Sequence, residues 1–65
     1  MLSEQVWNDA RRQISSARAG FRIENDGRTV EVMYGGGYRL YRDWKDVGIT
    51  WEIDKVMNFL RYGKI

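Results

Sequence analysis

The sequence predicts a small α+β domain in which a helix, a three-stranded antiparallel meander and a second helix follow one another. Both helices are expected on one face of the sheet. Apolar residues recur at helical spacing near both ends of the chain, and apolar and polar residues alternate in its middle. Glycine-marked breaks separate the alternating segments. All of residues 1–65 are expected to form one domain.

The composition limits how such a domain is stabilised. The chain has 65 residues, with no Cys and no His, so disulfides and the usual Cys/His zinc sites are excluded. It has three Trp, four Tyr and two Phe. Each aromatic side chain can bury about 150–250 Å² of surface. Stability is therefore expected from aromatic packing or from a partner subunit.

The charge pattern narrows the classes of partner. Eleven basic and nine acidic residues give a net charge of +2, and the two signs are interspersed along the chain. A generic polyanion binder usually carries a larger excess. No apolar run approaches the roughly 18 residues of a membrane span, and the N-terminus lacks a signal-peptide pattern. We expect a soluble cytoplasmic protein without a membrane partner.

The first helix is expected from Ser3 to Ala19. Ser3 is a good N-cap, and Leu2 and Trp7 occupy the positions of a hydrophobic staple. Gly20 is expected to end the helix, since glycine adopts the left-handed conformation without a Cβ penalty. The predicted apolar stripe consists of Val6, Trp7, Ala10, Ile14 and Ala17.

The first hairpin is expected to turn at Asp26-Gly27. A two-residue type I′ turn there pairs Asn25 with Arg28. The same register places Ile23 opposite Val30, Phe21 opposite Val32, and Arg22 opposite Glu31. Apolar residues then meet on one face and opposite charges on the other, as cross-strand pairing favours.

The second hairpin is expected to turn at Gly35-Gly36-Gly37, which pairs Tyr34 with Tyr38 and Val32 with Leu40. The glycines serve either the turn itself or a close approach of backbone or ligand. The predicted inner face consists of Phe21, Ile23, Val30, Val32, Tyr34, Tyr38 and Leu40. The predicted outer face consists of Arg22, Glu24, Thr29, Glu31, Met33, Arg39 and Tyr41.

The region of residues 42–49 is expected to be a loop or a short helical turn, with Trp44 plugging one end of the core. Thr50 is expected to cap a second helix that runs to Tyr62, and Gly63 is expected to end it. A strand over residues 48–53 is the competing interpretation, because ITWEI alternates. The helix's apolar stripe is expected at Ile53, Val56, Met57 and Leu60, with Phe59 at its border.

The leftover surface residues suggest a protein-interaction or regulatory module that binds a protein partner or associates with itself. Arg, Tyr and Trp are enriched in binding surfaces. Trp51, Lys55 and Tyr62 are expected opposite the stripe of the second helix, where the two aromatic rings either fold over the helix end or await a partner. The predicted binding residues are Met33, Arg39, Tyr41, Trp51, Lys55 and Tyr62.

The alternative is a nucleic-acid-binding domain that uses an Arg-bearing helix and the sheet face. Its predicted contacts are Arg11, Arg18, Arg22 and Arg39. The order helix, three strands, helix is similar to that of double-stranded RNA-binding domains, whose final helix begins with lysines. Here Glu52 and Asp54 occupy that region and would repel a phosphate backbone, so the sequence does not indicate membership.

Catalysis is not expected. Without His or Cys, the candidate nucleophiles Ser3, Ser15, Ser16, Thr29 and Thr50 lack an obvious activating base. Asp43 and Asp46 make a poor metal site, since Lys45 lies between them. The chain is also short for enclosing a pocket of about 300 Å³ or more. The sequence therefore predicts no metal, no cofactor and no small-molecule substrate.

Overall fold

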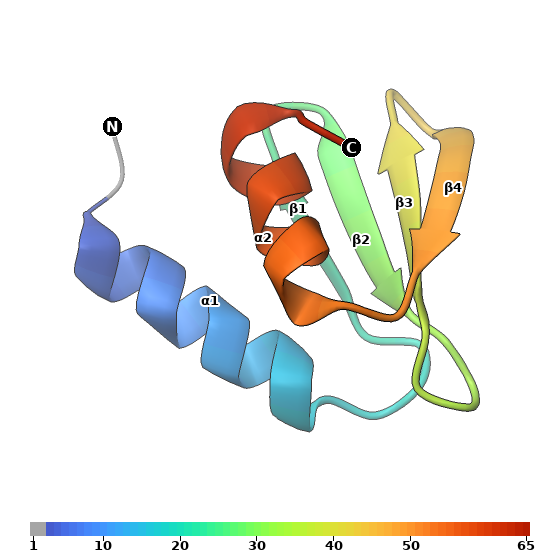
Figure 1. Cartoon of the computed structure of the whole chain (residues 1–65), viewed down its shortest axis with the longest axis horizontal. Coiled ribbons are helices and arrows are strands. Elements are labelled where there is room, and N and C mark those ends of the chain that lie inside the picture. The colour runs from blue at the N-terminus through green and yellow to red at the C-terminus, as the bar shows by residue number, and fades with distance from the viewer. Residues whose placement is uncertain (1–2) are drawn as a thin grey trace.

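The computed structural model describes residues 3–65, which form two helices and one antiparallel sheet (Figure 1). In chain order the elements are α1 (Glu4–Ser16), β1 (Arg22–Asn25), β2 (Arg28–Val32), β3 (Tyr38–Arg42), β4 (Lys45–Thr50) and α2 (Ile53–Tyr62). The strands lie side by side in the order β1-β2-β3-β4. The α+β class is confirmed. The expectation of three strands is wrong, because β4 is a fourth.

The core lies between the sheet and α2. This helix contacts all four strands, and α1 packs against α2. Phe59 and Val56 are fully buried, and Ile14 of α1 joins them in one cluster with sheet residues. The predicted apolar stripes thus supply most of the core, but Val6 of the first stripe is 44% exposed, and Phe59, predicted at the border of the second, is fully buried. The other buried members of this cluster are Trp7, Val30, Val32, Leu40 and Leu60.

The first helix begins as predicted and ends early. The Ser3 hydroxyl accepts a hydrogen bond from the Val6 N–H at 3.3 Å, which confirms the N-cap. Leu2 of the predicted staple lies outside the described residues. The helix ends at Ser16, so the predicted stop at Gly20 is wrong. Gly20 instead donates its N–H to the Val32 carbonyl at 2.7 Å, which leads the chain into the sheet.

The first hairpin has the predicted register. Asn25 pairs with Arg28, Ile23 with Val30, and Arg22 with Glu31. Asp26 and Gly27 take φ of 53° and 80°, as a type I′ turn requires. The Val32 N–H donates to the Phe21 carbonyl at 2.8 Å, which continues this pairing.

The second hairpin is shifted by two residues from the prediction. Val32 pairs with Tyr38 rather than Leu40, and the Met33 N–H donates to Gly37 at 2.8 Å. Residues 34–36 therefore form the loop. Tyr34 is 93% exposed, so its predicted place on the inner face is wrong. A shift of two preserves side-chain alternation, and the remaining inner residues keep their face.

The fourth strand follows a tight turn that the sequence pattern does not predict. Asp43 and Trp44 have φ of 50° and 65°, and Arg42 pairs with Lys45 across the turn. The prediction of a loop or helical turn here is wrong. The strand was missed because Asp-Trp is not a usual type I′ pair. A bulge lies farther along β4, where the Gly48 N–H donates to Asp46 Oδ1 at 3.0 Å.

The second helix begins two residues later than predicted. Its N-cap is Glu52, and the Thr50 hydroxyl accepts from the Glu52 N–H at 3.2 Å in the preceding turn. Both sequence interpretations of this region are therefore partly correct: a strand ends at Thr50 and a helix starts at Ile53. Gly63, with φ of 74°, ends the helix as predicted.

The C-terminal end of α2 is held by side chains from the sheet. Arg28 donates to the Leu60 carbonyl at 2.9 Å, and Asn25 donates to the same carbonyl at 2.8 Å. Arg42 donates to the Gly63 carbonyl at 2.6 Å. These side chains satisfy carbonyl groups at the helix end, and the two arginines also match the negative end of its dipole.

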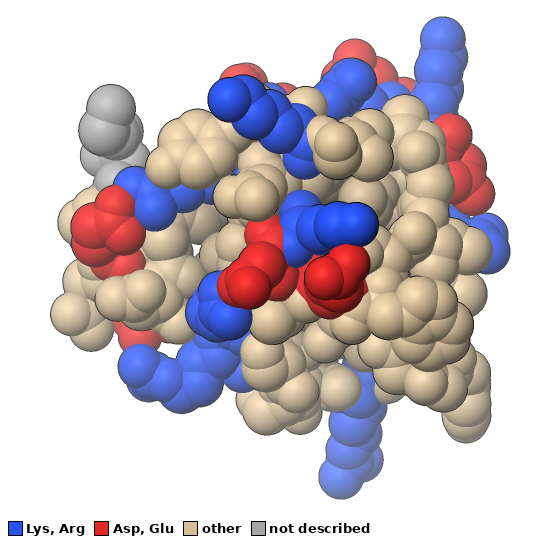
Figure 2. Space-filling model, viewed as in Figure 1, with Lys and Arg blue, Asp and Glu red and all other residues tan. Residues whose placement is uncertain are grey.

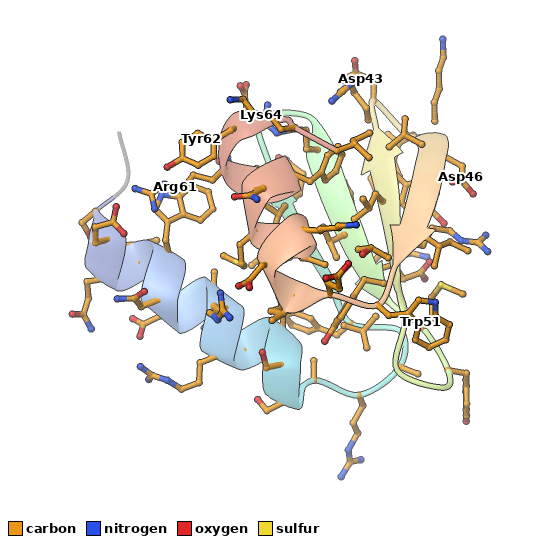
Figure 3. The ribbon with its side chains drawn as sticks, viewed as in Figure 1. Asp43, Asp46, Trp51, Arg61, Tyr62 and Lys64 are labelled. Atoms are coloured by element: carbon orange, nitrogen blue, oxygen red, sulfur yellow. The ribbon has the colours of Figure 1, made fainter. Side chains whose placement is uncertain are left out.

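Arg61 joins the two helices. It hydrogen-bonds the Glu4 carboxylate and lies over the rings of Trp7 and Tyr62, at 5.7 and 5.3 Å from their centroids (Figure 3). A second bridge joins Arg11 to Asp54 at 2.6 Å. The exposed residues Arg11 and Tyr62 thus have partners inside the chain.

The pKa of Glu4 is expected to lie below its ordinary value, chiefly because Arg61 hydrogen-bonds the carboxylate. The folded state gains from this pair above the pKa of the unfolded chain, and the gain disappears as pH falls through the lowered pKa. Carboxyl-resolved NMR titration of the natural chain and of Arg61→Met tests this. The variant should raise the Glu4 pKa toward its ordinary value, and identical values would contradict the contact.

Candidate interaction face

The outer face of the sheet carries two rows of side chains that cross all four strands. The register aligns Arg22, Glu31, Arg39 and Ile49 in one row. The next row holds Glu24, Thr29, Tyr41 and Asp46. Side chains alternate along each strand, so these rows point away from the core residues of the inner face. No helix of the described chain covers them (Figure 1).

Most charges in these rows are paired with each other. Arg22 donates two hydrogen bonds of 3.3 Å to one oxygen of Glu31, and the Tyr41 hydroxyl donates to the other at 3.2 Å. Arg39 lies 3.6 Å from Asp46. Thr29 is 2% exposed, so its predicted solvent exposure is wrong. The middle of the face is therefore a locally neutral network rather than a basic patch.

Trp44 lies at one end of this face. Its ring centroid is 6.1 Å from that of Tyr41, and the side chain is 67% exposed. The prediction that Trp44 plugs the core is wrong, because the turn at residues 43–44 directs it outside. Sequence reasoning missed Trp44 as a surface residue. The only available signal was its place between two acidic residues, Asp43 and Asp46.

Trp51 lies at the other end, in the link between β4 and α2. Its ring covers Gly37, which is buried, and a Cβ on that glycine would meet the ring at 3.3 Å. Trp51 is nevertheless 68% exposed. The third glycine of the triplet thus serves close approach of a ring, while Gly35 and Gly36 serve the loop with positive φ.

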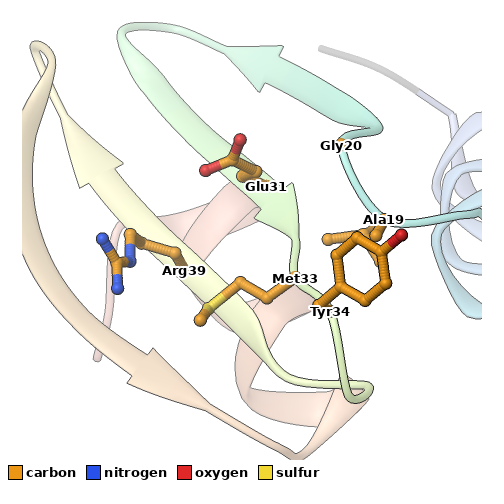
Figure 4. A pocket seen from close by; sticks show the side chains of 7 residues that line it. Ala19, Gly20, Glu31, Met33, Tyr34 and Arg39 are labelled. Carbon is orange, nitrogen blue, oxygen red and sulfur yellow. The ribbon is translucent and has the colours of Figure 1, made fainter.

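Met33 and Arg39 line a hollow of about 410 Å³ on this side, together with Glu31 and Tyr34 (Figure 4). The hollow is open to solvent rather than enclosed. It lies between the sheet, Tyr34 and the link that contains Ala19 and Gly20. The Nε of Arg39 is buried and has no hydrogen-bond partner among residues 3–65. The face thus carries an open depression lined by both apolar and charged side chains.

We call Met33, Arg39, Tyr41, Trp44 and Trp51 the aromatic face. Four of these residues were predicted binding residues, and the structure brings them onto one side of the sheet. Lys55 and Tyr62 do not join them. Both belong to α2, where Lys55 pairs with Glu52 at 3.0 Å and Tyr62 lies against Arg61. The predicted set therefore combined residues from two separate surfaces.

The four arginines of the nucleic-acid alternative do not share a surface. Arg22 and Arg39 lie on the outer face, whereas Arg11 lies on α1, on the helical side of the sheet. Arg18 follows the end of α1, so the expectation that the first helix carries both Arg11 and Arg18 is wrong. Figure 2 shows basic and acidic side chains interspersed over the helical side, and an uncharged region at lower right where Figure 3 places Trp51.

Two further features bear on the chemistry of the described residues. Within residues 3–65, no three Asp or Glu side chains lie together as a possible metal site. In the same part of the chain, neither helix has the length and apolar character needed to cross a membrane.

Comparison with known proteins adds no relative: no protein-family model, no curated protein and no solved structure matches this chain.

Proposed function

We propose that this chain is a small non-enzymatic protein-interaction module that binds a protein partner through the aromatic face. Tyr, Trp, Met and Arg are the residue types that dominate the centres of protein interfaces. Here they lie on strands of the sheet or immediately beside them, so their backbone is ordered before binding. A regulatory role of such a contact is part of the same proposal.

The backbone at Trp44 is the observation that carries this proposal. A non-glycine residue with positive φ costs about 1–3 kcal/mol, and Trp44 has φ of 65°. Trp44 is 67% exposed, and its ring lies 6.1 Å from that of Tyr41, so it buries little surface that could offset this cost. A strained and exposed tryptophan is poorly explained by stability. Contact with a partner gives it a physical reason.

The paired charges favour a protein over a nucleic acid. A phosphate backbone requires several unpaired cations along one path. On the outer face, Arg22 and Arg39 already face Glu31 and Asp46. Nucleic-acid binding therefore ranks second, although Tyr41, Trp44 and Trp51 could stack on bases.

Capture of partners from host lysate tests the proposal, with the lysate divided into nuclease-treated and untreated halves. The natural chain is expected to retain a protein from both halves. Trp44→Gly should reduce retention by about 30-fold, as expected for an interface hot spot. Tyr62→Ala is the matched control, since Tyr62 is an exposed aromatic residue outside the aromatic face.

Two outcomes would contradict the proposal. Retention that disappears after nuclease treatment would favour the nucleic-acid alternative. Equal loss with Trp44→Gly and Tyr62→Ala would remove the aromatic face as the binding surface, because the two variants delete exposed rings on different surfaces.

A further inference from the structure

We propose that two copies of this chain pair through β4, so that their sheets join into one continuous antiparallel sheet. This inference goes beyond the proposed function and does not depend on it. β4 is an end strand of the sheet, with β3 on one side only. It has six residues, against four in β1 at the opposite end. An end strand offers unpaired backbone groups to another strand.

The backbone groups that β4 presents can be assigned. The hydrogen bond from the Met33 N–H to Gly37 sets the alternation between β2 and β3, so the backbones of Arg39 and Tyr41 bond toward β2. Their neighbours on β4 are Ile49 and Asp46. The N–H and C=O groups of these two residues consequently point away from β3, toward the free edge.

The bulge selects one register for a symmetric pair. In a regular strand, residues three positions apart point to opposite faces. The bulge inserts one extra residue between Asp46 and Ile49, so both of these residues lie on the outer side. A two-fold axis between Val47 and Gly48 sets Asp46 opposite Ile49 of the second copy. In this register outer residues meet outer residues throughout, and edge-directed backbone groups meet each other. A shift by one position turns Asp46 against the inner positions Gly48 or Thr50.

The side chains of β4 and its flanks are self-complementary in that register. In this register Trp44 and Trp51 of the second copy, both exposed, flank the joined strands on the outer side at each end. Lys45 lies opposite Thr50, with Glu52 of the second copy at the diagonal position. Asp46 faces Ile49 rather than a like charge. This complementarity makes a second copy the occupant of the edge.

Introducing a negative or a positive charge at Ile49 tests both the dimer and its register. Ile49 is 48% exposed and pairs with Arg39 inside the chain. In Ile49→Glu the new carboxylate meets Asp46 of the second copy twice per dimer, and about tenfold weaker association is expected. In Ile49→Lys the new ammonium meets the same carboxylate, so association should be retained or strengthened. Within one chain, Arg39 lies beside position 49 and favours Glu over Lys there. An effect on folding stability alone would therefore give the opposite order of the two variants.

Sedimentation velocity over a concentration series at low salt provides the measurement. The natural chain is expected to pass from monomer to dimer between about 1 µM and 1 mM, the range of weak association. A monomer throughout that range would overturn the proposal. Equal association of Ile49→Glu and Ile49→Lys would overturn the register. Circular dichroism of each variant verifies that the fold is intact.

Failure of this proposal is distinguishable from failure of the proposed function. Ile49→Glu leaves every residue of the aromatic face in place. A monomeric Ile49→Glu that still retains a protein from lysate would separate partner binding from self-association.

Discussion

Replacing Phe59 with alanine is expected to lower the free energy of unfolding by about 3–5 kcal/mol. The Phe59 ring is fully buried between α2 and the sheet, and Arg42 lies over it at 5.6 Å from the ring centroid. Removing it deletes the largest fully buried side chain and leaves a cavity. A domain of this size has a total stability of only about 3–10 kcal/mol, so much of the variant should be unfolded at 25 °C.

Urea unfolding followed by circular dichroism measures the Phe59→Ala effect. Tyr34→Ala is the matched control, because Tyr34 is an aromatic residue that is 93% exposed in the second hairpin loop. It should change stability by less than about 0.5 kcal/mol. A large loss with Tyr34→Ala would show that Tyr34 belongs to the core and that the observed hairpin register is wrong.

Replacing Arg28 with methionine is expected to cost about 2–3 kcal/mol. Its guanidinium donates to the Leu60 carbonyl through two nitrogens, at 2.9 and 3.3 Å, and its side chain is only 16% exposed. Hydrogen bonds from a charged donor contribute about 1.5–3 kcal/mol. Methionine retains most of the apolar stem, so the loss reports on the contact with the helix end rather than on packing.

The Arg28→Met effect is measured by thermal and urea unfolding, with Arg12→Met as the control. The Arg12 side chain is 75% exposed, and its one salt bridge within residues 3–65 is to Asp9, at 3.5 Å. Arg12→Met should therefore change stability by less than about 0.5 kcal/mol. Hydrogen exchange adds a local readout, since amides in the last turn of α2 should exchange faster in Arg28→Met. Equal stability of the two variants would contradict a structural role for Arg28.

The sequence was sufficient where local chemistry determines the conformation. Asp26-Gly27 specifies its turn, and that turn determines the register of β1 and β2. The apolar spacing in both helices correctly identified their buried faces, and Ser3 and Gly63 correctly marked one end of each. These features depend on residues near one another in the chain.

The sequence was insufficient where packing decides between local alternatives. The glycine triplet could form a loop centred on any of its members, and the ring of Trp51 selects Gly37 as a packing position. The turn at Asp43-Trp44 opposes local preference, so β4 is stabilised by its pairing with β3 rather than by turn chemistry. Because the prediction lacked β4, it placed Trp44 in the core and Trp51 in the second helix.

The candidate site was partly predictable for the same reason. Met33, Arg39 and Tyr41 follow from side-chain alternation, which survives a register shift of two. Trp44 depends on the missed strand. The capping arginines, Arg28 and Arg42, reach α2 over long sequence separations that no local pattern indicates.

We propose that Trp44 is held in a strained, exposed position because it serves contact rather than stability. The free energy of unfolding of Trp44→Gly in urea tests this proposal. Glycine relieves the positive φ, which offsets the lost contact with Tyr41, so stability should stay within about 1 kcal/mol of the natural chain or increase. A loss of about 3 kcal/mol or more, as a buried tryptophan would give, would contradict the claim.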